Sequence, residues 1–562
     1  MEKKTLIAVV LILAVFWISN EFIWKPKAEE KLAADQARQA ELRQNPEPSQ
    51  TTTSPAEYDY EETAKPESNI QITAQDIPIQ TDLELRTNRP QDNLTYRFSN
   101  LGGLLTNVIL DEYSIKNSET EQLSPVDLIT ENGTIFNIVL NQRDGSQLDL
   151  SQIVFEPQIS HDQKKITFTH ETESGYIKRI YQITDKEYTL EMKIALQGFT
   201  ALDHYQIEMD DGIPDTENHL KMKSRDYQVN YQLNNEFKHF KLSALKSPQE
   251  IAENPKYQEK FNQMGKLDWA AIRSKYFIQA IIPNQLVNMS QLQAFSSKGS
   301  PAARLQVDVD KSFVEHQYQL YIGPLIAENL ETFSNGIINC VETGPGFLKW
   351  LSNFFLKVYM LIHSVIPSWG LAVIIFAVIL KTVLYPLTHK SFESTTKMQQ
   401  INPLMKEIQA KYKSDPKKMN DELRALYKEH GVNPMGGCLP MLLQMPILFA
   451  IYPIFRYSIN LRQSDFLWLP DLSEPDPFYI LPIVMALFMF LQQKLMAPSK
   501  AKLDEMDEKQ KAAMQSQRMM MYMMPLLMLF FFKSLASGLV LYWTVFSVIG
   551  TIQQVFIKKK FK

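Results

Sequence analysis

Apolar positions fall into two patterns along this chain: long continuous runs near both ends, and short alternating segments between them. The first continuous run, residues 5–24, follows Lys3 and Lys4 and is long enough to span a bilayer as a helix. A cleaved signal peptide has a short apolar core followed by a small-x-small cleavage site, and this run has no such site. We therefore predict that residues 1–24 form an uncleaved transmembrane anchor whose N-terminus is cytoplasmic.

A polar linker separates this anchor from the alternating region. Residues 25–68 are rich in Ala, Glu, Gln and Lys and then in Pro, Glu, Thr and Ser, with too few aliphatic side chains to bury a core. Within residues 69–333, apolar and polar positions alternate in segments such as 166–169, 188–196, 205–209 and 314–322. This period of two predicts antiparallel strands with one buried face, and their number predicts a single all-β sandwich domain.

Residues 334–368 connect the predicted sandwich to the apolar C-terminal part. Between residues 347 and 366, apolar side chains recur at three- and four-residue steps, interrupted by Lys349, Lys357 and His363. A helix with one apolar face and several polar interruptions is typical of a membrane surface rather than of a span. We predict an amphipathic helix that lies in the membrane interface and ends at Pro367.

Five further apolar runs follow the connector and, with the anchor, predict six transmembrane helices. The runs are residues 369–387, 435–457, 478–496, 519–532 and 535–557. The run 519–532 is short for an ordinary bilayer, so either its ends lie elsewhere or the membrane thins beside it. Residues 369–562 are thus expected to form a five-helix transmembrane core.

Residues 388–433 separate the first two of these five runs and carry two apolar stripes at helical spacing. Ser414-Asp415-Pro416 supplies a helix cap followed by proline at the first helical position, and Gly431 supplies a C-terminal stop. The segment is therefore predicted to be a basic helical hairpin. It would suit docking to lipid or to a ribosome, or would only link two spans.

The distribution of lysine and arginine predicts the orientation of the chain. Residues 388–433 and 498–518 and the tail Lys558-Lys559-Lys560 are basic, whereas residues 458–477 carry one basic residue beside four acidic ones. Basic loops stay in the cytoplasm. We expect a multi-pass protein of a bacterial inner membrane, with both termini cytoplasmic and the β domain in the periplasm.

Composition excludes several classes of function. The chain of 562 residues has a formal net charge of −5, and its β region has no basic stripe, so no nucleic-acid recognition site is expected. Cys340 and Cys438 predict neither a disulfide framework nor a metal site. No Walker-type glycine loop and no catalytic constellation stands out. We expect no enzymatic activity, no metal and no cofactor.

One lysine, Lys381, lies inside the apolar run 369–387. A charge in mid-membrane costs about 2.5–3.5 kcal/mol on insertion scales and marks a candidate functional residue. Its side chain could snorkel to the interface or pair with a carbonyl, or it could be a cation in a wet cavity. Gln444, Gln492 and Gln493 could line such a cavity, and no Asp or Glu lies in mid-span to neutralise the lysine.

Methionine and proline are frequent in the same part of the chain. Methionines around residues 519–528 and at Met441 and Met445 give adaptable apolar surfaces. Prolines such as Pro446 and Pro453 kink helices and expose backbone groups to cavities. These patterns alone leave open both an insertion factor and an ion-coupled transporter.

Four strings resemble the membrane core of the YidC/Oxa1/Alb3 insertases. They are Lys381-Thr-Val-Leu-Tyr-Pro-Leu387, Asn433-Pro-Met-Gly-Gly-Cys-Leu-Pro440, Gln444-Met-Pro446 and Ser537-Gly-Leu-Val-Leu-Tyr542. Two more, Trp269-Ala-Ala-Ile-Arg-Ser-Lys-Tyr-Phe277 and Tyr321-Ile-Gly-Pro324, are similar to the periplasmic domain of bacterial members of the family. The resemblance covers nearly the whole chain outside the linker.

This resemblance implies an insertase and chaperone that inserts inner-membrane proteins and helps them fold, alone or with the Sec translocon. The implied partners are nascent inner-membrane proteins, the ribosome, the Sec translocon and membrane lipids. A hydrated, positively charged groove would contain Lys381 and Gln444. An apolar slide for the span of the substrate would consist of Leu442, Met445, Leu448, Ile451, Tyr542 and Trp543.

The chain departs from the family pattern at two of these positions. The groove cation is commonly arginine and here is Lys381, which keeps the charge but loses the bidentate fork. Trp543 stands where an aromatic hydroxyl is frequent. A second hypothesis, a periplasmic ligand-binding module on a membrane anchor, follows from the resemblance of the family's outer domain to sugar-binding sandwiches.

Overall fold

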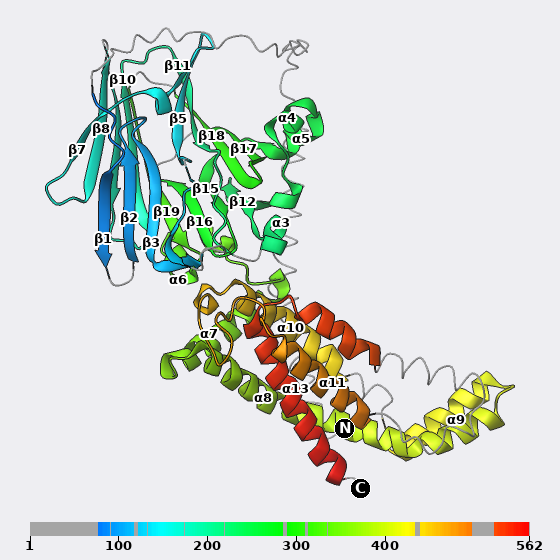
Figure 1. Ribbon diagram of the computed structural model, residues 1–562. Helices are drawn as coiled ribbons and strands as arrows, with labels where there is room; N and C mark the ends of the chain where they lie inside the picture. Colours follow the sequence, from blue (N-terminus) through cyan, green and yellow to red (C-terminus); the bar gives the residue numbers. More distant parts are fainter. Residues whose placement is uncertain are drawn as a thin grey trace, which may run out of the picture.

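The computed structural model describes residues 77–560, apart from 90–91, 117–121, 132, 173–174, 218–219, 285–288, 310–312, 334, 433–438 and 497–521. The predicted anchor, the predicted linker and the string 433–438 lie outside the described residues. A β-rich domain and a helical bundle follow each other along the chain and lie end to end in space (Figure 1).

Among the described residues of the β-rich domain, antiparallel strands form three sheets. The four-stranded sheet has the order β1 (Leu83–Arg89), β2 (Asp92–Ser99), β3 (Leu104–Lys116), β4 (Leu123–Asp127). The nine-stranded sheet has the order β13 (Glu236–Lys241), β12 (Gln228–Leu233), β15 (Leu267–Arg273), β16 (Phe277–Pro283), β19 (Phe313–Pro324), β10 (Thr189–Gln197), β9 (Gly175–Ile183), β8 (Lys165–Thr172), β7 (Glu156–Ile159). The six-stranded sheet has the order β14 (Asn262–Gln263), β17 (Met289–Ser297), β18 (Ser300–Asp308), β11 (Leu202–Met209), β5 (Asn137–Gln142), β6 (Gln147–Asp149).

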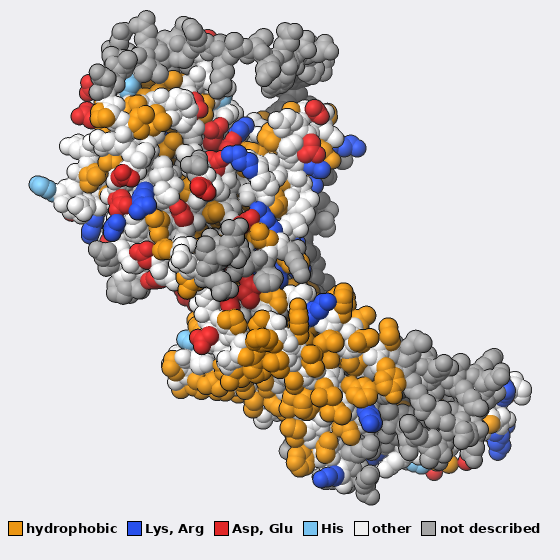
Figure 2. Space-filling view, viewed as in Figure 1, with side chains coloured by type: hydrophobic (Ala, Val, Ile, Leu, Met, Phe, Trp, Pro, Cys, Tyr) orange, Lys and Arg blue, Asp and Glu red, His pale blue; other side chains and the backbone are white. Residues whose placement is uncertain are grey.

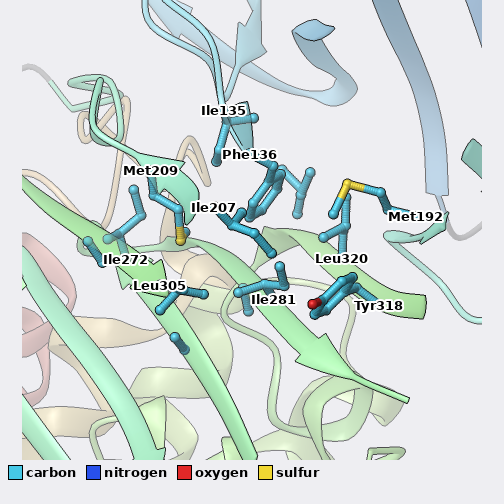
Figure 3. Close-up of a cluster of buried hydrophobic side chains, with 14 of the residues drawn as sticks. Ile135, Phe136, Met192, Ile207, Met209, Ile272, Ile281, Leu305, Tyr318 and Leu320 are labelled. Atoms are coloured by element: carbon cyan, nitrogen blue, oxygen red, sulfur yellow. The ribbon is translucent and has the colours of Figure 1, made fainter. Parts of the chain in front are cut away.

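Alternation along these strands buries a continuous apolar core. Figure 3 shows Ile207 and Leu305 of the six-stranded sheet in one cluster with Ile281 and Leu320 of the nine-stranded sheet. The four-stranded sheet joins the same core through Phe98, whose ring centroid lies 4.9 Å from that of Tyr181. The three sheets therefore form one folding unit rather than separate modules.

The predicted alternating segments coincide with β8, β10, β11 and β19, so the expected β-rich domain is confirmed. The expectation of an all-β domain missed three short helices: α3 (Lys223–Asp226), α4 (Pro248–Glu253) and α5 (Pro255–Phe261). Helix α4 begins at Pro248, and the preceding residue, Ser247, forms a capping box with Glu250. Such brief helices bury few side chains, so they leave no periodic signal long enough to identify.

The helical part contains α7 (Lys349–Val365), α8 (Trp369–Lys411), α9 (Pro416–Glu429), α10 (Leu439–Tyr457), α11 (Ile480–Met496), a helix at Tyr522–Phe532, and α13 (Ser537–Lys560). Among the described residues, Trp369–Ser394 and Ser537–Ile557 are long and apolar enough to cross a membrane, and Ile480–Leu495 and Tyr522–Phe532 are shorter apolar helices. Figure 2 shows apolar side chains covering this bundle, while charged side chains dot the β-rich domain. The count of six spans stays a prediction.

Helix α7 exposes apolar side chains on one face and buries others against the bundle. Trp350, Phe354, Leu361 and Val365 are exposed, whereas Phe355 and Tyr359 are buried against the bundle. An exposed apolar face of this kind suits the membrane interface, where its placement stays a prediction. The helix ends at residue 365, next to the predicted stop at Pro367.

Helix α8 does not stop where the first core span was predicted to end. It continues for 43 residues, with Pro386 and Pro403 inside it, and its last part forms one arm of a helical hairpin with α9 (Figure 1). The predicted span and the first arm of the predicted hairpin thus share one helix, which stays unbroken where the sequence changes from apolar to polar. The membrane boundary at residues 387 and 388 stays a prediction. Helix α9 begins as predicted, with Asp415 capping Lys418 N and Pro416 at the first position. Gly431 has a φ of +61° just beyond its end.

The junction between the two parts is built from the string that begins at Trp269. Its indole Nε1 donates to Asn335 O at 3.0 Å, and Arg273 Nη1 donates to Cys340 O at 2.7 Å. The Tyr276 hydroxyl donates to Arg456 O of α10 at 3.3 Å. One strand-turn-strand unit thus fixes both the connector before α7 and the end of α10.

Candidate functional site

One face of α13 is buried in the interior of the bundle, where α8 and α11 pack on this helix. Tyr542, Phe546 and Gly550 follow one another at four-residue steps on this helix and are buried. Residues spaced by four lie above one another on a helix, and the rings of Tyr542 and Phe546 are 5.8 Å apart. We refer to these three residues as the α13 stripe.

Lys381 points into the bundle and lies against this stripe. The residue is 3% exposed, and its Nζ lies 3.7 Å from the centroid of the Phe546 ring. The cation–π contact offsets part of its desolvation, but one ring does not saturate three N–H donors. The side chain is directed inward, so this geometry does not favour snorkelling to the interface.

Gln444 of α10 lies near the Tyr542 hydroxyl, two turns along the stripe from Gly550. Tyr542 Oη and Gln444 Nε2 are both buried and close enough to interact with each other, but neither makes a hydrogen bond of good geometry to a described residue. Oε1 of Gln554, one turn beyond Gly550, is also buried and makes no such bond. Buried polar atoms are nearly always paired with protein or water. A line of buried, incompletely paired polar atoms along one helix therefore indicates a place for water or a polar guest.

The residues predicted to form the apolar slide lie in different environments. Met445 is 42% exposed, and Leu448 is partly buried on the same helix. Ile451 and Tyr542 are fully buried in the bundle core. Trp543 is partly buried, and its ring centroid lies 5.7 Å from that of Phe532. The backbone of Leu442 belongs to α10, but its side chain lies outside the description.

The structure therefore brings Lys381, Gln444 and Tyr542 together along the α13 stripe, and it places Met445 on an outward face of α10. Sequence reasoning missed Phe546 and Gly550. Their four-residue spacing from Tyr542 places them on the same face of α13. This spacing identifies them as site residues only once α8 is known to pack on that face. No group of three His, Cys, Asp or Glu among the described residues could hold a metal ion.

Sequence reasoning also missed two arginines that lie at the end of the bundle next to the β-rich domain and pair with residues of that domain. Arg456 pairs with Asp226 at 2.7 Å, and Arg462 pairs with Glu217 at 3.0 Å. In the sequence, each arginine is more than 200 positions from its partner. Nothing in the local pattern could join them.

Comparison with known proteins assigns the two parts of the chain to two family descriptions. Residues 90–358 match the YidC periplasmic domain, and residues 361–562 match the family described as 60Kd inner membrane protein. The membrane protein insertase YidC of Chlorobaculum parvum is 31% identical over 88% of this chain and 86% of that protein. The protein of the same name from Chlorobium luteolum is 32% identical over 82% of this chain and 80% of its own length.

A solved structure described as an active YidC insertase with its first transmembrane domain resolved is 17% identical to this chain. The alignment covers 84% of this chain and 94% of that one, with a TM-score of 0.33.

Proposed function

Because the chain belongs to the YidC family of membrane protein insertases, we propose that it inserts its substrates through a hydrated, positively charged groove along the α13 stripe. The observation that carries this proposal is Lys381, buried against Phe546 on a helix face that also carries the buried polar ends of Tyr542 and Gln554. Lys381 and Gln444 belong to the groove, and Met445 and Leu448 begin an apolar slide beside it.

The chemistry of insertion follows from these residues. A polar, often acidic substrate tail must leave water, and its desolvation is the main cost of the step. A cation in a medium of reduced dielectric attracts that tail more strongly than it would in water. Buried donors and acceptors along the stripe replace some of the tail's lost hydrogen bonds. The adjacent exposed apolar face accepts the hydrophobic span of the substrate, and methionine adapts to varied sequences.

The charges at the ends of the bundle support the proposed orientation. The helical hairpin extends from the end of the bundle opposite to the β-rich domain (Figure 1), and α9 carries Lys417, Lys418, Arg424 and Lys428. Basic segments stay in the cytoplasm. The proposed location is the bacterial inner membrane, with both termini and the hairpin cytoplasmic and the β-rich domain periplasmic. The hairpin is a docking surface for the ribosome or for anionic lipid, and the Sec translocon is a partner for some substrates.

A crosslinking experiment tests the slide. A photo-crosslinking residue is placed at Met445 or at Leu448, and ribosomes are stalled on a single-span membrane protein. We expect crosslinks to the nascent span from both positions. Leu371 on α8 is the matched control, because it is 43% exposed, nearly the same as Met445, and lies near the opposite, outer end of its helix. If Met445 and Leu448 give no more crosslinks than Leu371 while ribosomes are bound, the proposed slide is wrong.

A further inference from the structure

Gly550 lies where the Lys381 side chain meets α13. A Cβ atom built on Gly550 would lie 3.0 Å from Lys381 Nζ and 3.5 Å from its Cε. The same Cβ would lie 3.4 Å from Nε2 of Gln492 on α11. The missing side chain therefore leaves a niche that the ammonium group fills.

Three helices define this niche. Phe546 on α13 supplies the aromatic face 3.7 Å from Nζ, Gly550 supplies the space one turn further on, and α11 contributes the Gln492 amide at the side. Helix α13 packs extensively on both α8 and α11, so the niche is enclosed by elements that hold one another in place. An ammonium is compact, whereas a guanidinium is broad and planar. The niche thus matches the lysine of this chain.

We propose that Gly550 is a positioning residue for the groove cation: by lacking a Cβ it lets the Lys381 ammonium lie against α13, over Phe546 and beside Gln492. This inference rests on the proposed function of Lys381 and adds the residue that fixes where its charge lies. A larger side chain at position 550 would push Nζ away from the ring and shift the charge relative to an incoming substrate tail.

Gly550→Val and Gly550→Ala test the proposal, with Gly538→Ala as the control. Gly538 lies on the same helix, and a Cβ there would meet Leu461 and Leu472 at 3.2 Å, far along the helix from Lys381. The control therefore introduces a comparably tight methyl group without touching the lysine. Gly550→Ala adds only a single methyl, so it remains informative if the valine variant fails to fold.

The first readout is the rate at which an amine-reactive ester acylates Lys381 in the full-length protein, measured by mass spectrometry. Buried in its niche, the amine should react slowly. We expect a several-fold faster reaction in Gly550→Val, a smaller increase in Gly550→Ala and no change in Gly538→Ala. Equal acylation in all four proteins would overturn the proposal, whatever their insertion activity.

The second readout is insertion of a single-span substrate with an acidic tail, measured with and without Lys381→Ala. If Gly550 acts through the lysine, Gly550→Val lowers insertion when Lys381 is present and has no further effect when it is absent. An equal loss in both backgrounds would show a merely structural role. Full insertion by Lys381→Ala alone would instead contradict the proposed groove cation, and the acylation rates would still decide whether Gly550 positions the lysine.

Discussion

Arg456, near the end of α10, and Asp226, at the end of α3, form an ion pair that crosses from the helical bundle to the β-rich domain. The distance from Nη2 to Oδ2 is 2.7 Å, and the side chains are 9% and 5% exposed. The Tyr457 hydroxyl donates to the same carboxylate at 3.3 Å. The two parts of the protein are therefore joined by desolvated charges and should lose their structure together.

Arg456→Ala is expected to destabilise this junction strongly. Removing one partner leaves the Asp226 carboxylate buried and uncompensated, which typically costs about 3–5 kcal/mol. The measurement is thermal unfolding in detergent, together with limited proteolysis of residues 335–345. Arg86→Ala is the control, because its pair with Glu84 is largely exposed and such pairs contribute little. If both variants melt like the parent, the ion pair does not hold the junction.

The second junction pair predicts an unusual pH dependence. Burial raises the pKa of the Glu217 carboxyl, and the nearby Arg462 and Lys275 offset only part of this effect. Because folding raises the pKa of Glu217, its contribution to stability is fully present when the pH is below the ordinary pKa of about 4.3. This contribution is lost as the pH rises through the raised pKa of the folded protein. Charged Glu217 therefore costs stability at neutral pH.

Glu217→Gln should consequently raise the unfolding temperature at pH 7, and the difference from the parent should vanish near pH 4, where both side chains are neutral. Tryptophan fluorescence during heating, repeated across this pH range, provides the measurement. A lower unfolding temperature for the variant at pH 7 would mean that the attraction of Arg462 exceeds the cost of burial.

Ile451 and Met445, both predicted to be slide residues, should respond differently to truncation. Ile451 is fully buried in the bundle core, so Ile451→Ala should cost about 2–5 kcal/mol through lost packing and a residual cavity. Met445 is exposed, so Met445→Ala should change stability by no more than about 0.5 kcal/mol. Insertion per folded molecule should fall only for Met445→Ala. A folded Ile451→Ala protein with lower insertion would restore Ile451 to the slide.

The Lys381 series tests whether charge alone is required. Lys381→Arg should still support growth in cells that depend on this protein, because the cation remains, but its insertion yield should fall below that of the parent because the broad guanidinium does not fit the niche. Lys381→Ala should insert acidic-tailed substrates poorly, and Lys381→Glu should be the worst because it repels them. Insertion yields for substrates with zero, one or several acidic tail residues would be compared. Equal activity of Lys381→Ala would exclude the electrostatic account.

Local patterns predicted what depends on local physics. Alternation located β8, β10, β11 and β19, and the cap at Asp415 located the start of α9. Lys381 was identified only because a charged side chain inside an apolar run has a high free-energy cost. The partners of these residues could not be predicted, because Phe546 and Gly550 become neighbours of Lys381 only when α13 packs on α8. The same holds for Asp226 and Arg456, whose partnership depends on how the two parts of the chain dock.

The unbroken course of α8 has a mechanical consequence. At 1.5 Å per residue, its 43 residues reach about 65 Å, from the outer end of the bundle to the hairpin. Lys381 and the first arm of the hairpin thus belong to one continuous helix. Pro386 and Pro403 each remove one backbone hydrogen bond from this helix. Helix α8 therefore connects Lys381 to the hairpin through a helix with two weakened points. A partner bound to the hairpin is thus coupled, through the backbone of α8, to the helix that carries the buried charge.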